Sequence, residues 1–163
     1  MKLKKYIALM LALILLAALG ACGEKTADIS AYGDYEIEIS GLLDEDFTIT
    51  PNDLLALPCV SRSATGRAEK AGTVAARGPL LETFLEQYGY TMSDFYKIRF
   101  IASDNYKTVL RDDYLTDYEV VMAVSSGEKP LDESLWPLRL LIPEAESNMW
   151  IYSIVRIEFE FEE

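Results

Sequence analysis

The sequence predicts an α+β domain with a mixed, mostly antiparallel sheet and two short helices. Segments that alternate apolar and polar residues, or are rich in β-branched and aromatic residues, recur along the chain to its last residues. Helical spacing is found in two places, both before residue 90. Strands that outnumber helices, with the helices gathered early in the chain, are typical of α+β domains.

Two strands and a helix are expected to open the domain. Residues 35–40 alternate apolar and polar side chains, which predicts a half-buried strand, and residues 46–49 predict a second short strand. Thr50 and Asp53 form a capping box around Pro51, a residue that favours the first helical position. We therefore expect a helix from residue 50 that is stopped by Pro58.

The middle of the chain predicts a hairpin and a second helix. Residues 60–78 alternate moderately around a turn at residues 69–72, which favours a β-hairpin. Apolar residues between 80 and 88 have helical spacing, and Gly89 stands where a helix C-cap belongs.

The second half predicts strands. Residues 103–106 look like a tight turn between two of them, and the alternation of residues 158–163 favours an edge strand protected by charge. The strand-like segments are residues 97–103, 106–110, 119–124, 138–142 and 150–161.

The N-terminus carries the features of an export signal. Three lysines precede an uncharged apolar run, residues 6–19, which is shorter than the roughly 20 residues of a membrane-spanning helix. The run ends in Leu-Gly-Ala-Cys, which resembles the lipobox of bacterial lipoproteins. We expect a signal peptide over residues 1–21, lipid on Cys22, a tether over residues 22–33 and one domain over residues 34–163. An uncleaved membrane anchor is the alternative.

Composition excludes several classes of function. The chain has 27 acidic and 15 basic residues and a formal charge of −12, a balance that repels nucleic acid. It has no histidine, which removes the usual general base and the Ser-His and Cys-His nucleophile pairs. Of its two cysteines, Cys22 is expected to carry lipid, so Cys59 has no partner for a disulfide within the chain.

Several local motifs occur in an order that resembles a known family. They are residues 38–43, the Leu-Pro at 57–58, Arg-Gly-Pro-Leu-Leu at 77–81, Ala-Ser-Asp-Asn-Tyr at 102–106, Trp-Pro-Leu-Arg-Leu-Leu-Ile-Pro at 136–143 and residues 150–158. Together they resemble the oxidoreductase molybdopterin-binding domain of sulfite oxidases and their bacterial relatives. Asn105 stands where the family usually has glycine, and both residues tolerate positive φ. The resemblance implies a sulfite-oxidase-like fold over nearly the whole domain.

The resemblance also implies a cofactor, whose ligands this sequence matches poorly. In catalytic members a cysteine thiolate on the strand after the Leu-Pro helix end binds molybdenum, and basic and histidine residues hold the pterin phosphate. Cys59 comes several residues too early for that ligand, so we expect no catalytic residue and take Cys59 as a weak metal candidate. Burial as a small apolar residue is its alternative role.

Arginines are the residues left to hold a pterin. The candidates for cofactor binding are Arg62, Arg67, Arg77, Asn105 and Arg139, with Lys70 near the first three. The alternatives are a hairpin with solvated cationic tips and, for Arg139, an ion pair with a surface carboxylate.

These observations favour a lipid-anchored binding module on the extracytoplasmic face of the cell membrane, rather than an enzyme. It would present the loops at residues 62–78, 103–106 and 125–130 to a ligand or to a membrane or extracytoplasmic redox partner, and it would not bind nucleic acid. Two alternatives stay open: an active molybdopterin-dependent oxidoreductase, and a substrate-capturing lipoprotein of a transporter. The sequence predicts no cofactor firmly, although molybdopterin is possible.

Overall fold

The computed structural model describes residues 26–66 and 72–162. The expected signal peptide, the lipid site Cys22, and Arg67 and Lys70 lie outside the described residues. None of the helices in the described ranges is long and apolar enough to span a membrane.

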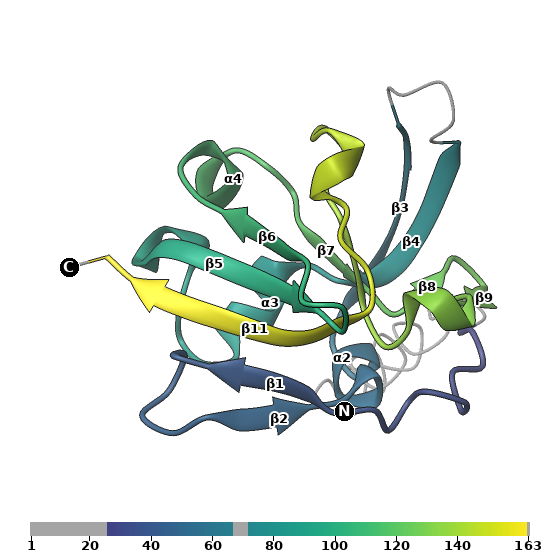
Figure 1. Ribbon diagram of the computed structural model, residues 1–163, viewed down its shortest axis with the longest axis horizontal. Helices are drawn as coiled ribbons and strands as arrows, with labels where there is room; N and C mark the ends of the chain where they lie inside the picture. Colours follow the sequence, from purple (N-terminus) through teal and green to yellow (C-terminus); the bar gives the residue numbers. More distant parts are fainter. Residues whose placement is uncertain (1–25, 67–71, 163) are drawn as a thin grey trace, which may run out of the picture.

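A five-stranded sheet with the order β2-β1-β11-β5-β6 forms the front of the molecule (Figure 1). Its strands are β1 (Ile37–Ser40), β2 (Phe47–Ile49), β5 (Phe95–Ala102), β6 (Lys107–Leu110) and β11 (Ile154–Phe161). Among these pairings β1–β11 is parallel and the others are antiparallel. The expected mixed, mostly antiparallel sheet is confirmed.

The remaining strands form a second layer. They are β3 (Cys59–Thr65), β4 (Thr73–Pro79), β7 (Val121–Ala123), β8 (Ser125–Ser126), β9 (Lys129–Pro130) and β10 (Arg139–Leu141). The β3–β4 pair is the predicted hairpin, and it projects away from the five-stranded sheet (Figure 1). Strand β7 lies beside β4, because Leu81 N donates to Val120 O and Val124 N donates to Arg77 O.

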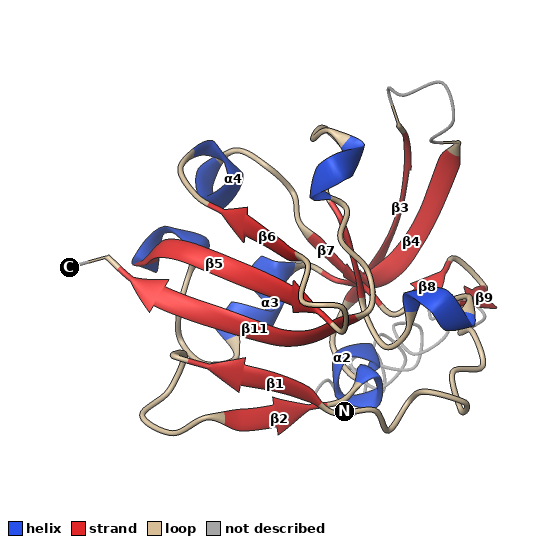
Figure 2. Cartoon of the chain, in the orientation of Figure 1, coloured by secondary structure: helices blue, strands red, loops and turns tan. Residues whose placement is uncertain are grey.

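Short helices connect these strands (Figure 2). They are α2 (Pro51–Leu55), α3 (Leu81–Glu86) and α4 (Asp113–Thr116), with 3₁₀ turns η1 (Met92–Asp94), η2 (Glu133–Leu135) and η3 (Ser147–Met149). The capping box of Thr50 and Asp53 starts α2 as expected. Both predicted helices are confirmed, and α4 adds a third within the described residues.

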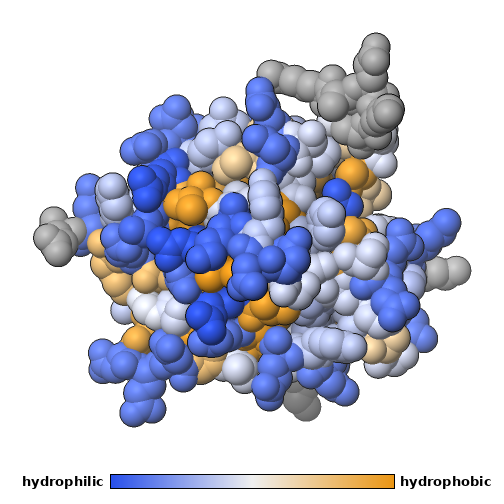
Figure 3. All heavy atoms as spheres, viewed as in Figure 1, coloured by the Kyte–Doolittle hydropathy of each residue, from blue (hydrophilic) through white to orange (hydrophobic). Residues whose placement is uncertain are grey.

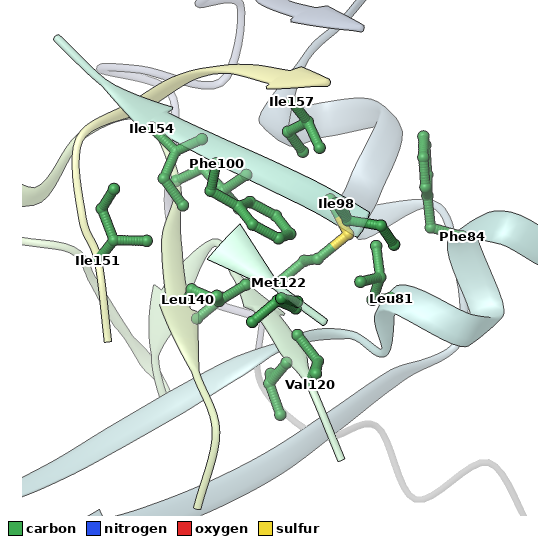
Figure 4. Close-up of a cluster of buried hydrophobic side chains, with 14 of the residues drawn as sticks. Leu81, Phe84, Ile98, Phe100, Val120, Met122, Leu140, Ile151, Ile154 and Ile157 are labelled. Atoms are coloured by element: carbon green, nitrogen blue, oxygen red, sulfur yellow. The ribbon is translucent and has the colours of Figure 1, made fainter. Parts of the chain in front are cut away.

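The core fills the space between the two layers. Met122 of β7 and Leu140 of β10 are 0% exposed, and they pack toward Ile98 and Phe100 of the five-stranded sheet (Figure 4). Gly78 of β4 lies so close to β7 that an added Cβ would be 1.9 Å from Met122 O. The absence of a side chain at residue 78 is therefore what lets β4 approach β7.

The C-terminal strand is central rather than an edge strand. β11 pairs with β1 on one side and with β5 on the other, so the expectation of a charge-protected edge was wrong. Its outward charges instead form ion pairs across the sheet: Arg156 with Glu38, Glu158 with Arg99, and Glu160 with Lys97. Hydrophilic side chains accordingly cover much of this face (Figure 3). The alternating charges therefore indicated a sheet face that is exposed to solvent. Both central and edge strands can have such a face.

The described part of the expected tether packs against the domain. Ala27, Ile29 and Tyr32 are buried in a small cluster with Leu131, and the ring of Tyr32 stacks on Trp136 at a centroid distance of 4.8 Å. Tyr32 Oη donates to Val124 O (2.7 Å) and accepts from Leu131 N (2.9 Å). This segment is short and has no hydrophobic periodicity, so the sequence did not predict that it packs against the domain.

Removing the Tyr32 hydroxyl tests this attachment. Tyr32→Phe leaves two backbone groups without their partner and should lower the free energy of unfolding by about 1–3 kcal/mol at neutral pH. Burial raises the pKa of Tyr32, so its contribution is complete below the unfolded-state pKa of about 10 and is lost as the pH rises through the folded-state pKa. Urea denaturation should show the difference from wild type narrowing above pH 10. Tyr35→Phe, at an exposed ring, is the matched control, and an equal loss in both variants would contradict the attachment.

Candidate functional site

A pocket of about 490 Å³ lies where the β5–β6 turn meets the segment that precedes β11. That volume is within the range of about 300–1,000 Å³ in which small ligands bind. The lining residues are Ala102, Ser103, Asp104, Tyr106, Ser134, Ser147, Asn148, Trp150, Ile151, Tyr152 and Ser153.

The β5–β6 turn forms one wall. Asn105 has φ of 67°, the positive value that the sequence predicted it could adopt, and its N–H donates to Ala102 O. Asp104 Oδ1 accepts from Tyr106 N at 2.9 Å. These bonds fix the direction in which the Tyr106 side chain leaves the turn. The predicted turn at residues 103–106 is confirmed.

The opposite wall is irregular chain that the sequence suggested would be strand. Trp150 Nε1 donates to Ile142 O (2.8 Å), and Ser153 has φ of 54°, so strand β11 begins only at Ile154. Ser103 N donates to Ser153 O (2.9 Å), which joins the two walls at the base of the pocket. Ser153 Oγ donates to Ser134 O and brings η2 to the rim. The sequence of residues 150–153 does not predict this break in the expected strand.

Two exposed tyrosines flank a mostly neutral lining. Tyr106 and Tyr152 are 53% and 51% exposed. Tyr106 Oη is 3.5 Å from Asn148 O, a long hydrogen bond that spans the two walls. Asp104 is the one charged residue among the described lining residues, and no lysine or arginine is among them. The site therefore offers hydroxyl, amide and aromatic groups rather than positive charge.

The predicted arginines do not converge on this pocket. Arg62 forms a bidentate ion pair with Glu119, with Nε–Oε2 at 2.5 Å and Nη2–Oε1 at 2.7 Å, and this partner raises the pKa of Arg62. Arg77 is buried on β4. Because Ser61 pairs with Arg77 and Arg62 with Ala76, alternation puts the two arginines on opposite faces of the hairpin. Of the predicted loop at residues 103–106, Ser103, Asp104 and Tyr106 line the pocket, whereas the predicted site residue Asn105 does not. Residues 125–130 form the β8–β9 hairpin beside β4.

Arg139 lies behind the Tyr152 wall. Leu140 N donates to Ile151 O and Ile154 N donates to Leu138 O, so β10 runs beside the segment that carries Tyr152. Arg139 Nε is buried and has no hydrogen-bond partner among the described residues. Burial lowers the pKa of Arg139, and the nearby Tyr152 acts in the opposite direction. The expected ion pair with a surface carboxylate is not found in the described part of the chain.

Cys59 lies at the base of the hairpin, in contact with the end of α2. Its Sγ donates to Leu57 O at 3.3 Å and is 3.9 Å from Leu54 O. In this position the thiol acts as a hydrogen-bond donor to the backbone, whereas the thiolate is the form that ligates soft metals. Among the described residues, no three His, Cys, Asp or Glu side chains gather as a metal site. The donors of the described residues do not fit a thiolate-bound molybdenum, whereas the buried Nε of Arg139 is an unused donor that fits an anion.

Comparison with known proteins identifies the family. The family model of the oxidoreductase molybdopterin binding domain matches residues 24–163. The chain belongs to this family, as its motifs suggested.

The similar solved structures include the sulfane dehydrogenase SoxCD from Paracoccus pantotrophus. It superposes with a TM-score of 0.64 at 20% sequence identity, covering 80% of this chain and 39% of the SoxCD chain. At this identity the likeness shows the fold, which is therefore sulfite-oxidase-like. No curated protein matches the sequence.

Replacing Arg139 tests whether its charge stabilises the fold. A half-buried guanidinium whose Nε has no partner carries a desolvation cost, and methionine has a similarly unbranched side chain without the charge. We expect Arg139→Met to be as stable as wild type or more stable by about 1 kcal/mol in urea denaturation. Arg99→Met, which breaks the pair with Glu158, should lose up to about 1 kcal/mol. If Arg139→Met instead lost more than about 1 kcal/mol, contacts of Arg139 within the protein, and not a ligand, would explain why an arginine stands there.

Proposed function

We propose that this chain is a lipid-anchored binding module that uses the molybdopterin-binding scaffold without thiolate-molybdenum chemistry. The observation that carries the proposal is the placement of Cys59. Its thiol donates to the carbonyl at the end of α2, and it begins β3 instead of standing further along the hairpin. A residue held in this way stabilises the junction between α2 and β3.

The rest of the hairpin supports the same proposal. Beyond Cys59, strand β3 offers Ser61, Ser63 and Thr65 on the same face, and hydroxyl groups are poor substitutes for a soft thiolate. Histidine is absent from the whole sequence, so no imidazole can hold a pterin or move a proton. A scaffold with neither group can bind ligands but lacks the residues on which the chemistry of catalytic members depends.

The sequence of the N-terminus supports a location for the module at the cell membrane. A basic start, a short apolar run and the Leu-Gly-Ala-Cys sequence support export, lipidation of Cys22 and retention at the extracytoplasmic face of the membrane. There the domain would meet a ligand or a membrane or extracytoplasmic redox partner. Its acidic surface makes nucleic acid an unsuitable partner.

An active molybdopterin-dependent oxidoreductase is the second candidate. Membership of the family and the unused Nε of Arg139 favour it, because a guanidinium with a spare donor could hold an anionic group of the cofactor. If such a cofactor binds, Arg139 could orient it through this donor, and the cofactor itself would supply the redox chemistry. This candidate requires a metal ligand that the described residues do not offer.

Molybdenum content separates the two candidates. The full chain, made in a host that synthesises molybdopterin, should contain less than about a tenth of an equivalent of molybdenum and of released fluorescent pterin, because Cys59 is engaged by backbone carbonyls. Elemental analysis and pterin fluorescence measure both. Cys59→Ala should give the same values as wild type. Stoichiometric molybdenum and pterin that disappear in Cys59→Ala would overturn the proposal and establish the enzyme.

A further inference from the structure

The pocket between the β5–β6 turn and residues 150–153 is rich in side-chain groups that both donate and accept hydrogen bonds. The hydroxyls of Ser103, Ser134 and Ser147 and the amide of Asn148 make no side-chain hydrogen bond with other described residues. Each can donate and accept at once. Ligand hydroxyl groups match these side chains well, because each hydroxyl can also donate and accept.

Aromatic surface lies beside these polar groups. Tyr106 and Tyr152 line the pocket and are each about half exposed, while Trp150 and Ile151, which also line it, are buried. The electron-rich faces of aromatic rings attract C–H groups. Aromatic rings next to paired donors and acceptors suit a ligand with one C–H face and a rim of hydroxyls.

Charge narrows the class of ligand. Asp104 is the one charged group among the described lining residues, and it is negative. An anionic ligand would find no countercharge and would meet a carboxylate, which is unfavourable. A quaternary ammonium would use the tyrosines but could not satisfy the serine and asparagine groups. A neutral polyhydroxylated ligand satisfies both, and Asp104 can accept hydrogen bonds from its hydroxyls.

We propose that this pocket binds a neutral saccharide, with Tyr106 and Tyr152 contacting the C–H face of a sugar ring and Asp104, Asn148 and the serines binding its hydroxyls. The inference rests on the proposed function, because it assigns the module's ligand to this pocket and gives its chemical class. Its volume of about 490 Å³ is that of a site for a small ligand.

The test is calorimetric titration of the full chain with maltotriose, cellotriose and the trimer of N-acetylglucosamine, in a detergent without a sugar headgroup. At least one should bind, and Tyr152→Ala and Tyr106→Ala should each weaken binding about tenfold or more, as loss of an aromatic contact residue does. Tyr96→Ala is the matched control, because Tyr96 is 49% exposed but lies outside the pocket, and it should bind like wild type.

Three results would overturn the inference: no binding of any trisaccharide at millimolar concentration, binding that both pocket variants leave unchanged, or binding of choline or inorganic phosphate that Tyr152→Ala abolishes. Molybdenum and pterin are measured on the same preparation. Protein that carries no cofactor and binds no saccharide would refute the ligand class alone. Protein that carries a full complement of cofactor would refute the proposed function itself.

Discussion

Strand β11 is the element on which the arrangement of the molecule depends. It forms hydrogen bonds along both edges, parallel to β1 and antiparallel to β5, and so joins the first strand of the domain to β5. Its inward residues Ile157 and Phe159 pack into the core, while its outward charges pair with those of both neighbours. The buried side chains hold the strand in register; the exposed ion pairs each contribute little and mainly keep the outer face soluble.

The position of β11 also determines where a site can form. Because β11 is fixed beside β5, the irregular chain just before it is placed against the β5–β6 turn, and Ser103 N bonds to Ser153 O. The pocket opens beside this contact. The β3–β4 hairpin, where the family's metal ligand would lie, projects from the other layer (Figure 1), and its base holds Cys59 against α2. Cys59, the one described cysteine, does not line the pocket. In our account, ligand binding by tyrosine, serine and asparagine groups takes the place of metal ligation.

Much of the fold could be predicted from the sequence because local rules decided it. The capping box at Thr50, the alternation of β1 and the positive φ of Asn105 each depend on a few neighbouring residues. The order of the motifs identified the family and, with it, the fold. The pairing of β11 was missed because an outward row of glutamates looks the same on an edge strand and on a central strand whose neighbours carry arginine and lysine.

The candidate site was only partly predictable, for a related reason. The turn at residues 103–106 was recognised, but its partner wall was not, since the break at Trp150–Ser153 depends on Ser153 adopting φ of 54° and on the distant contact with Ser103. The arginines stood out because the chain is acidic, yet Arg62 is neutralised by Glu119, which is far away in sequence. Charge pattern alone does not reveal which cations are already paired.

The central claim is that Cys59 is a neutral thiol hydrogen-bonded to a backbone carbonyl. The S–H stretching band in the infrared spectrum tests it most directly, because a thiol has this band and a metal-bound thiolate does not. In the lipidated protein from a host that makes molybdopterin, the account predicts one S–H band, at a frequency typical of a hydrogen-bonded thiol, that disappears in Cys59→Ala. A wild-type protein without an S–H band, in which Cys59 is not oxidised, would contradict the account and show the thiolate engaged as a ligand.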